Sequence, residues 1–199
     1  MLLLFLSLLL QLTMFVGLAH LWSRRARLGV LESIVAALLT DHLLQLLLMA
    51  LLSAGHALSP VGYRISFGIT GGAILIWALR GSDDSAPSLL AQWRRDVSKL
   101  STATTLLAAG ALLLAVYRAS FFFDTTYDSL TYSLPRLAFY AQERSIFFLT
   151  GLPDLRLDAN ERNGELAFLH QLLLAGDTRW LALGGVACWL TMLAALLFL

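Results

Sequence analysis

Long apolar runs separated by short polar links dominate this chain. A helix that crosses a bilayer needs about 20 mostly apolar residues. Five runs approach or exceed that length, at residues 2–22, 28–55, 61–79, 100–117 and 180–199. The pattern therefore predicts an all-α integral membrane protein with about five transmembrane helices.

The composition agrees with this prediction and excludes an ordinary water-soluble globule. Of the 199 residues 58% are hydrophobic and 14% are charged, whereas soluble domains carry about 25% charged residues. A net charge of +1 gives no reason to expect nucleic acid as a partner. The single cysteine, Cys188, excludes an intrachain disulfide framework.

The basic residues suggest an orientation. The two short links at residues 23–27 and 80–99 hold seven of the fourteen Lys and Arg residues. The short link at 56–64 on the other side holds only Arg64, which is expected to snorkel from its span toward the interface. Because short cytoplasmic loops are enriched in Lys and Arg, we expect the N-terminus outside and residues 118–179 outside as well.

Residues 118–179 differ from the rest of the chain, since they carry eight of its thirteen acidic residues. Structureless loops longer than ~12–15 residues are uncommon in compact proteins, and aromatic residues recur throughout this one. We therefore expect an extracytoplasmic helical module between a four-span region, residues 1–117, and a fifth transmembrane helix, residues 180–199.

Two helices are expected in this module. Pro135 suits the first turn of a helix that ends near Gln142. Asn163 suits the N-cap of a helix over residues 164–175, and Gly176 suits its C-terminal stop. Along the second helix four residues fall at helical spacing: Leu166, Leu169, Leu173 and, on a neighbouring turn, His170.

Two pairs of carboxylates in the module have helical spacing. Asp124 and Asp128 are four residues apart, as are Glu161 and Glu165. On a helix each pair shares a face, with Cβ atoms about 5–6 Å apart. Such pairs suit general-base chemistry or a divalent metal ion, and they also occur as solvated carboxylates at an interface. The spacing alone leaves these alternatives open, and with them the question of a metal at Asp124 and Asp128.

Polar residues inside the apolar runs are the other candidates. Asp41 and His42 lie in the middle of the second run, where an aspartate costs about 2.5–3.5 kcal/mol on insertion scales. Hydrogen bonding between helices, a proton relay, and a tetrapyrrole or metal ligand at His42 all remain open. Gly68, Gly71 and Gly72 favour close packing of the third helix against a neighbour.

Two stretches of the outer module resemble a known family. Residues 127–136 read YDSLTYSLPR, followed by LAFYAQ, and residues 164–180 read GELAFLHQLLLAGDTRW. They are similar to the D-x-L-T-Y-H-L-P-R and A-E-x-x-x-L-H-x-x-x-L-x-G-x-D-R stretches of bacterial polytopic glycosyltransferases of the glycosyltransferase C superfamily. These enzymes use lipid-linked sugar donors.

The resemblance implies transfer of a sugar from a polyprenyl-phosphate donor, with inversion, at the outer face of a bacterial inner membrane. It implies Asp128 as general base and Asp124 as a nearby second carboxylate. It further implies residues that bind the donor phosphate or substrate: Tyr132, Arg136, Glu165 and His170.

A second hypothesis belongs to a different class. Ser133 stands where the family motif has His, and Asn163-Gly164 replaces its usual Pro-Pro. Members of the family are also far longer than 199 residues. We therefore expect either the N-terminal part of a longer enzyme or a short relative, the latter acting as a non-catalytic subunit that packs against a larger membrane complex through its apolar helices.

Overall fold

A computed structural model describes residues 2–80, 134–147 and 163–178, together with a few single residues: Ala91, Arg94, Leu106, Gly110, Leu113, Tyr117, Leu181 and Val186. These parts contain helices and no strand, which confirms the all-α prediction. The predicted fourth and fifth spans, at 100–117 and 180–199, lie almost entirely outside the described residues.

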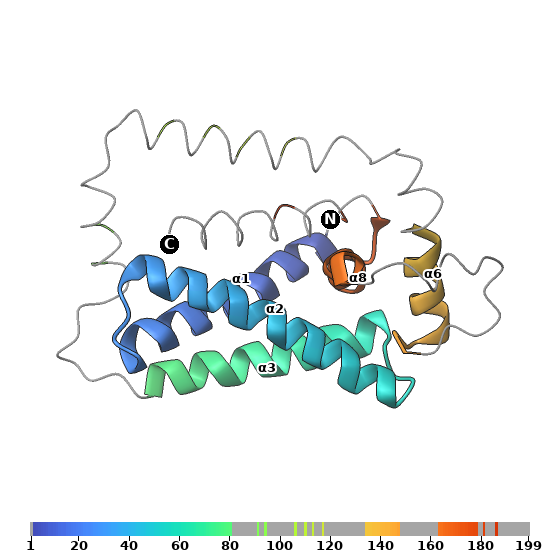
Figure 1. Cartoon of the computed structure of the whole chain (residues 1–199), viewed down its shortest axis with the longest axis horizontal. Helices are drawn as coiled ribbons and strands as arrows, with labels where there is room; N and C mark the ends of the chain where they lie inside the picture. The colour runs from blue at the N-terminus through green and yellow to red at the C-terminus, as the bar shows by residue number, and fades with distance from the viewer. Residues whose placement is uncertain are drawn as a thin grey trace.

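The first three apolar runs form long helices that lie side by side (Figure 1). They are α1 (Leu2–Arg25), α2 (Val30–Ala54) and α3 (Pro60–Arg80). Short links join them, so α2 runs opposite to α1 and α3. All three are long and apolar enough to cross a membrane, which is consistent with the first three predicted spans.

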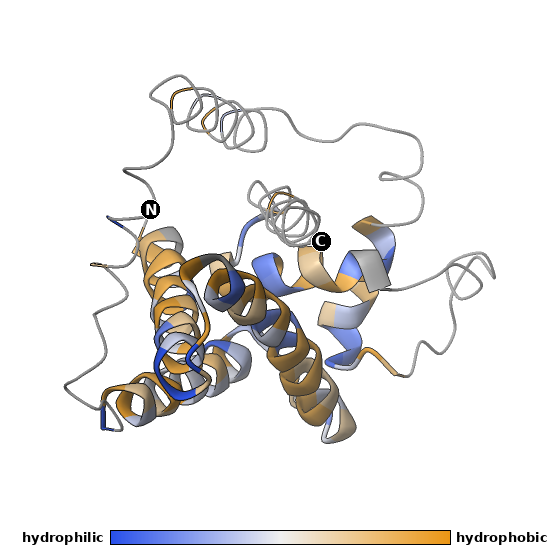
Figure 2. Cartoon of the chain, turned by 60° about the vertical axis from the view of Figure 1, so that its left-hand side comes forward, coloured by the Kyte–Doolittle hydropathy of each residue, from blue (hydrophilic) through white to orange (hydrophobic). Residues whose placement is uncertain are grey.

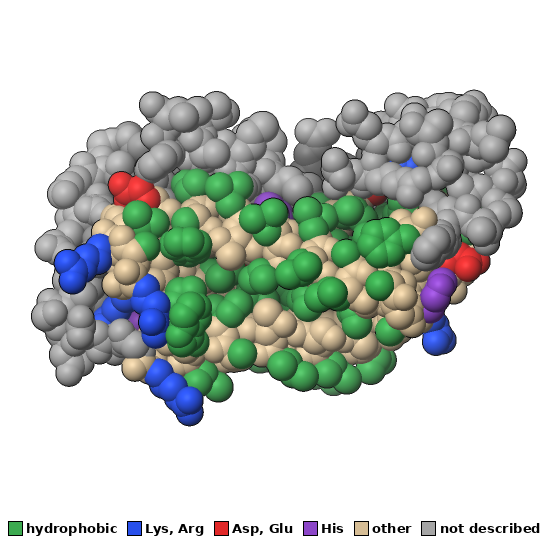
Figure 3. Space-filling view, turned by 60° about the horizontal axis from the view of Figure 1, so that its bottom comes forward, with side chains coloured by type: hydrophobic (Ala, Val, Ile, Leu, Met, Phe, Trp, Pro, Cys, Tyr) green, Lys and Arg blue, Asp and Glu red, His purple; other side chains and the backbone are tan. Residues whose placement is uncertain are grey.

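Large apolar side chains cover the outside of the three helices. Figure 2 shows hydrophobic residues along most of their length, and Figure 3 shows these side chains spread over one face. On α3 the exposed face carries Val61, Ile65, Ile69 and Ile76. An apolar surface of this extent is the kind that lipid covers in a membrane protein.

Glycines let α1 and α3 approach closely. A Cβ added to Gly17 on α1 would lie 3.2 Å from the Cα of Leu75, and one added to Gly71 on α3 would lie 3.6 Å from the Cα of Met14. Gly68 also faces α1, whereas a Cβ at Gly72 would meet nothing within 4 Å. The predicted close packing is thus confirmed for two of the three glycines on α3.

Both helices predicted in the outer module are present. They are α6 (Leu134–Glu143) and α8 (Asn163–Ala175). Pro135 lies in the first turn of α6, as predicted. At the end of α8, Gly176 has φ +71° and its N–H donates to the carbonyl of Leu172 at 2.8 Å. This left-handed residue is the predicted C-terminal stop.

The end of α2 and the link from α2 to α3 both bond to the segment that follows α6. The backbone N–H of Leu58 donates to the carbonyl of Arg144 at 3.1 Å, and the N–H of Ile146 donates to the Ser53 hydroxyl at 3.0 Å. Helix α6 therefore lies at the end of the bundle where α2 stops and α3 starts (Figure 1). The C-terminal ends of α1 and α3, with their arginines, lie at the opposite end.

Candidate functional site

Helix α8 is the element on which the candidate site is built. The four residues predicted to share helical spacing, Leu166, Leu169, His170 and Leu173, lie on this helix and are all buried. The three leucines join one apolar core with residues of α1, α3 and α6. Polar groups of α8 also bond to each of those three helices, so the helix is fixed by both packing and hydrogen bonds.

The first polar contact joins α8 to α6. Nη1 of Arg136 lies 2.8 Å from Oε2 of Glu165, forming a charge-assisted hydrogen bond. Arg136 is 0% exposed and Glu165 is 8% exposed. The two residues are 29 positions apart in the sequence. The structure therefore joins α6 and α8 through a buried charged pair.

The second polar contact joins α8 to α3. The hydroxyl oxygen of Tyr63 lies 2.7 Å from Nδ1 of His170, and both side chains are buried. The imidazole also packs against the rings of Tyr63 and Phe67, at centroid distances of 5.7 and 5.2 Å. His170 is thus enclosed by α3 and bonded to it.

His170 is held in its neutral form by this environment. Burial, and to a smaller extent the nearby His42, lower the pKa of His170 from the usual value to about 3. A neutral ring has one N–H and one acceptor nitrogen. Either tautomer can share a hydrogen bond with the Tyr63 hydroxyl.

Two further contacts fix the second half of α8. Nε2 of Gln11 on α1 donates to Oε1 of Gln171 at 3.0 Å. Nε of Arg64 on α3 donates to the carbonyl of Leu174 at 2.7 Å. Arg64 is therefore bound to the C-terminal end of α8 instead of simply snorkelling. A cation at this position also interacts favourably with the helix dipole.

The candidates Asp41 and His42 lie on α2, near the Tyr63–His170 hydrogen bond. Nε2 of Gln45 donates to Oδ2 of Asp41 at 2.9 Å, within α2 itself. In the part of the chain that the structure describes, Oδ1 of Asp41 has no hydrogen-bond partner. Asp41 lies within electrostatic range of Tyr63, and His42 within range of His170. The two residues thus extend the polar interior around α8 toward the middle of α2.

The remaining predicted site residues stand outside the described part of the chain. These are Asp124, Asp128, Tyr132 and Glu161, which is the first residue of the pair Glu161 and Glu165. Among residues 2–80, 134–147 and 163–178, no three His, Cys, Asp or Glu side chains lie close enough together to hold a metal ion. The roles of Asp124, Asp128 and Tyr132, and a metal ion bound by Asp124 and Asp128, remain predictions.

Sequence reasoning missed three contributors to this site. The sequence did not predict Tyr63, Arg64 or Gln11 as partners of α8. Gln11 lies within the first apolar run. A lone glutamine inside such a run is a usable signal, because buried polar side chains seek a partner.

Comparison of the chain with known protein families, with curated proteins and with solved structures gives no match.

Proposed function

We propose that this chain is a membrane glycosyltransferase, or the N-terminal part of one, that transfers a sugar from a polyprenyl-phosphate donor with inversion. The observation that supports the proposal most is the buried pair of Arg136 and Glu165. Each residue belongs to one of the two family-like stretches, and a shared site requires that those stretches meet.

The proposed reaction begins with a proton transfer to Asp128. Its carboxylate takes the proton of the acceptor hydroxyl, and the hydroxyl oxygen attacks the anomeric carbon of the donor sugar. The bond from that carbon to the phosphate oxygen breaks, and polyprenyl phosphate leaves with the bonding electrons. Attack opposite the leaving group inverts the anomeric configuration. Asp124 is the nearby second carboxylate in this scheme.

Arg136 and Glu165 have linked roles in the proposal. A guanidinium has five N–H donors in a planar fork that suits phosphate, so Arg136 is the proposed contact for the donor phosphate. Glu165 accepts from Nη1 and fixes the plane of that fork. Because the guanidinium is fully enclosed, donor binding requires α6 and α8 to open slightly around it.

The location of this pair suits a lipid-linked donor. Helices α6 and α8 pack at the end of the bundle where α1 begins, α2 ends and α3 begins. That end is the outer one in the topology predicted from the basic loops. A donor whose lipid tail lies in the outer leaflet would present its phosphate at this level.

The experiment is sugar transfer by the full chain in proteoliposomes that contain polyprenyl-phosphate sugars. Wild type is compared with Asp128→Asn, with Asp124→Asn, and with Gly72→Ala as a control distant from the site. Loss of a general base lowers rates about 10²–10⁴-fold, so Asp128→Asn should lose nearly all transfer while Gly72→Ala keeps it. An unchanged rate in Asp128→Asn would refute the assignment of the base.

If the wild-type chain does not transfer sugar, the second hypothesis, a non-catalytic subunit, has to be tested. Stable co-purification with larger membrane subunits, together with no consumption of any polyprenyl-phosphate sugar, would identify a non-catalytic subunit and contradict the proposed transfer.

A further inference from the structure

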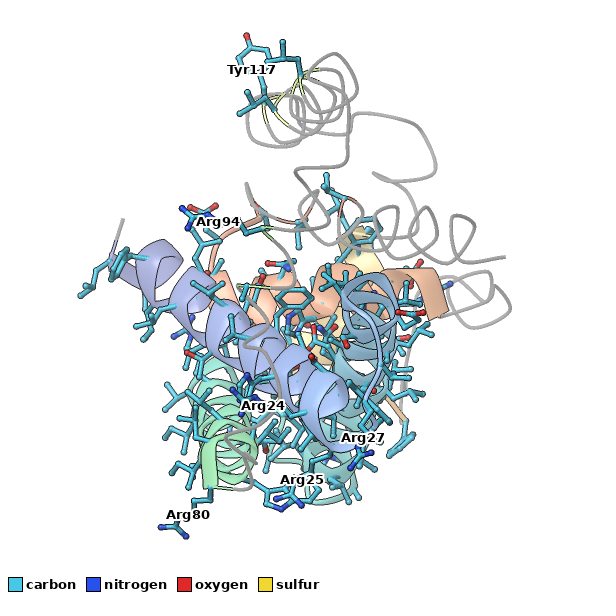
Figure 4. All side chains as sticks on the ribbon, turned by 90° about the vertical axis from the view of Figure 1, so that its left-hand side faces the viewer. Arg24, Arg25, Arg27, Arg80, Arg94 and Tyr117 are labelled. Atoms are coloured by element: carbon cyan, nitrogen blue, oxygen red, sulfur yellow. The ribbon has the colours of Figure 1, made fainter. Side chains whose placement is uncertain are left out.

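A cluster of four arginines lies at the end of the bundle opposite α6. Arg24 and Arg25 end α1, Arg27 follows in the link to α2, and Arg80 ends α3. Figure 4 labels all four, and Figure 3 shows Lys and Arg side chains gathered at that end. Arg25, Arg27 and Arg80 are exposed. We refer to these four residues as the arginine cluster.

One member of the cluster is fixed in place by α3. The guanidinium of Arg25 lies 4.6 Å from the ring centroid of Trp77, a cation–π contact, and its Nη2 lies 3.5 Å from the Trp77 carbonyl oxygen. Trp77 is itself half exposed. Tryptophan favours the level where lipid headgroups meet the hydrocarbon region. In a bilayer this contact would place a cation at the level of the headgroups.

The local carboxylate does not neutralise the exposed arginines. Within residues 2–80 the acid at this end is Glu32, in the first turn of α2. Its carboxylate folds back against Gly29, where it meets the N-terminus of its own helix. No ion pair joins Glu32 to Arg25, Arg27 or Arg80 in this part of the chain. Among residues 2–80, this end therefore holds four arginines and one carboxylate.

We propose that the arginine cluster binds the phosphate headgroups of anionic phospholipids in the leaflet that it faces. Arg80 follows the exposed side chains of Ile76, Trp77 and Leu79 at the end of α3, and Arg25 of α1 lies against Trp77. Acyl chains would cover those side chains, and the phosphate would then lie beside the guanidinium groups. The arginine fork binds phosphate oxygens through two N–H donors. This site does not depend on the proposed sugar transfer.

The test places the protein in nanodiscs of phosphatidylcholine, with and without a minority of phosphatidylglycerol. Native mass spectrometry counts the phosphatidylglycerol retained on the released protein, and thermal unfolding is followed in parallel. The wild type is compared with the triple variant Arg25→Gln, Arg27→Gln and Arg80→Gln. Arg144→Gln is the matched control, because Arg144 is also exposed but lies beside α6 at the other end.

We expect wild type and Arg144→Gln to retain phosphatidylglycerol and to unfold at a higher temperature in its presence. The triple Gln variant should lose about fivefold in lipid affinity for each arginine removed, equivalent to ~1 kcal/mol per residue. A triple Arg→Lys variant keeps the charge and should retain part of the effect even if the Gln variant is unstable. Equal retention by wild type and the Gln variant would overturn the proposal. Equal stabilisation by inorganic phosphate in pure phosphatidylcholine would overturn it too, because the ligand would then be a free anion.

Discussion

The hydroxyl of Tyr63 on α3 and Nδ1 of His170 on α8 lie 2.7 Å apart, although 107 residues separate them in the sequence. Both side chains are buried. This hydrogen bond fixes α8 to the third apolar helix, and α8 in turn holds α6 through Glu165 and Arg136. The position of the candidate site on the bundle thus depends on a contact from a helix that carries none of the motif residues.

Removal of the Tyr63 hydroxyl tests this dependence. Tyr63→Phe keeps the ring stacked on Phe67, at a centroid distance of 6.0 Å, but leaves a buried nitrogen of His170 without this partner. An unsatisfied buried group costs about 1–3 kcal/mol, so unfolding in detergent should show a loss of that size. Tyr117→Phe alters an exposed tyrosine and should change stability by less than ~0.5 kcal/mol. Equal losses in both variants would contradict the role of this hydrogen bond.

The low pKa of His170 predicts a loss of stability in mild acid. The folded protein protonates this ring only near pH 3, whereas an unfolded chain does so near pH 6.5. Between those values the unfolded state binds more protons, so the free energy of unfolding contributed by His170 falls as the pH drops from about 6.5. His170→Asn cannot titrate in this range. Its unfolding free energy should vary less steeply with pH than that of wild type, and identical slopes would contradict a buried neutral histidine.

Gly17 provides a test of the close contact between α1 and α3. The Cβ of Gly17→Ala would lie 3.2 Å from backbone atoms of Leu75, which is closer than ordinary van der Waals contact, so the two helices must move apart. Gly72→Ala adds the same atom where nothing lies within 4 Å. Overpacking of this kind costs about 1–3 kcal/mol. We expect a lower thermal midpoint for Gly17→Ala alone, and equal midpoints would show that the helices are not packed this closely.

Much of the local structure could be predicted from the sequence. Hydropathy gave the three long helices to within about three residues, because a continuous apolar run is a local property of the chain. Pro135 predicted the start of α6, because its fixed φ suits the first turn of a helix. Gly176 predicted the end of α8, because glycine readily adopts a positive φ. The spacing of Leu166, Leu169, His170 and Leu173 predicted the helical geometry of α8, but not the burial of His170.

The partners of these residues could not be predicted in the same way. Whether Glu165 meets Arg136, or His170 meets Tyr63, depends on how α8 crosses helices that are distant in sequence. Periodicity carries no information about such crossings. The resemblance to a glycosyltransferase family implies that Arg136 and Glu165 share one site, but it does not indicate that they bond directly.

That the two family-like stretches form one site is tested most directly by a double-mutant cycle on Arg136 and Glu165. The unfolding free energy is measured in detergent for wild type, Arg136→Gln, Glu165→Gln and the double variant. Removing one partner of a buried ion pair costs about 3–5 kcal/mol, and the second removal should then cost little. We predict that the double variant loses at least ~1.5 kcal/mol less than the sum of the single losses, within the range found for residues in contact. Losses that add to within ~0.5 kcal/mol would show that the residues do not interact and would contradict a single site formed by α6 and α8.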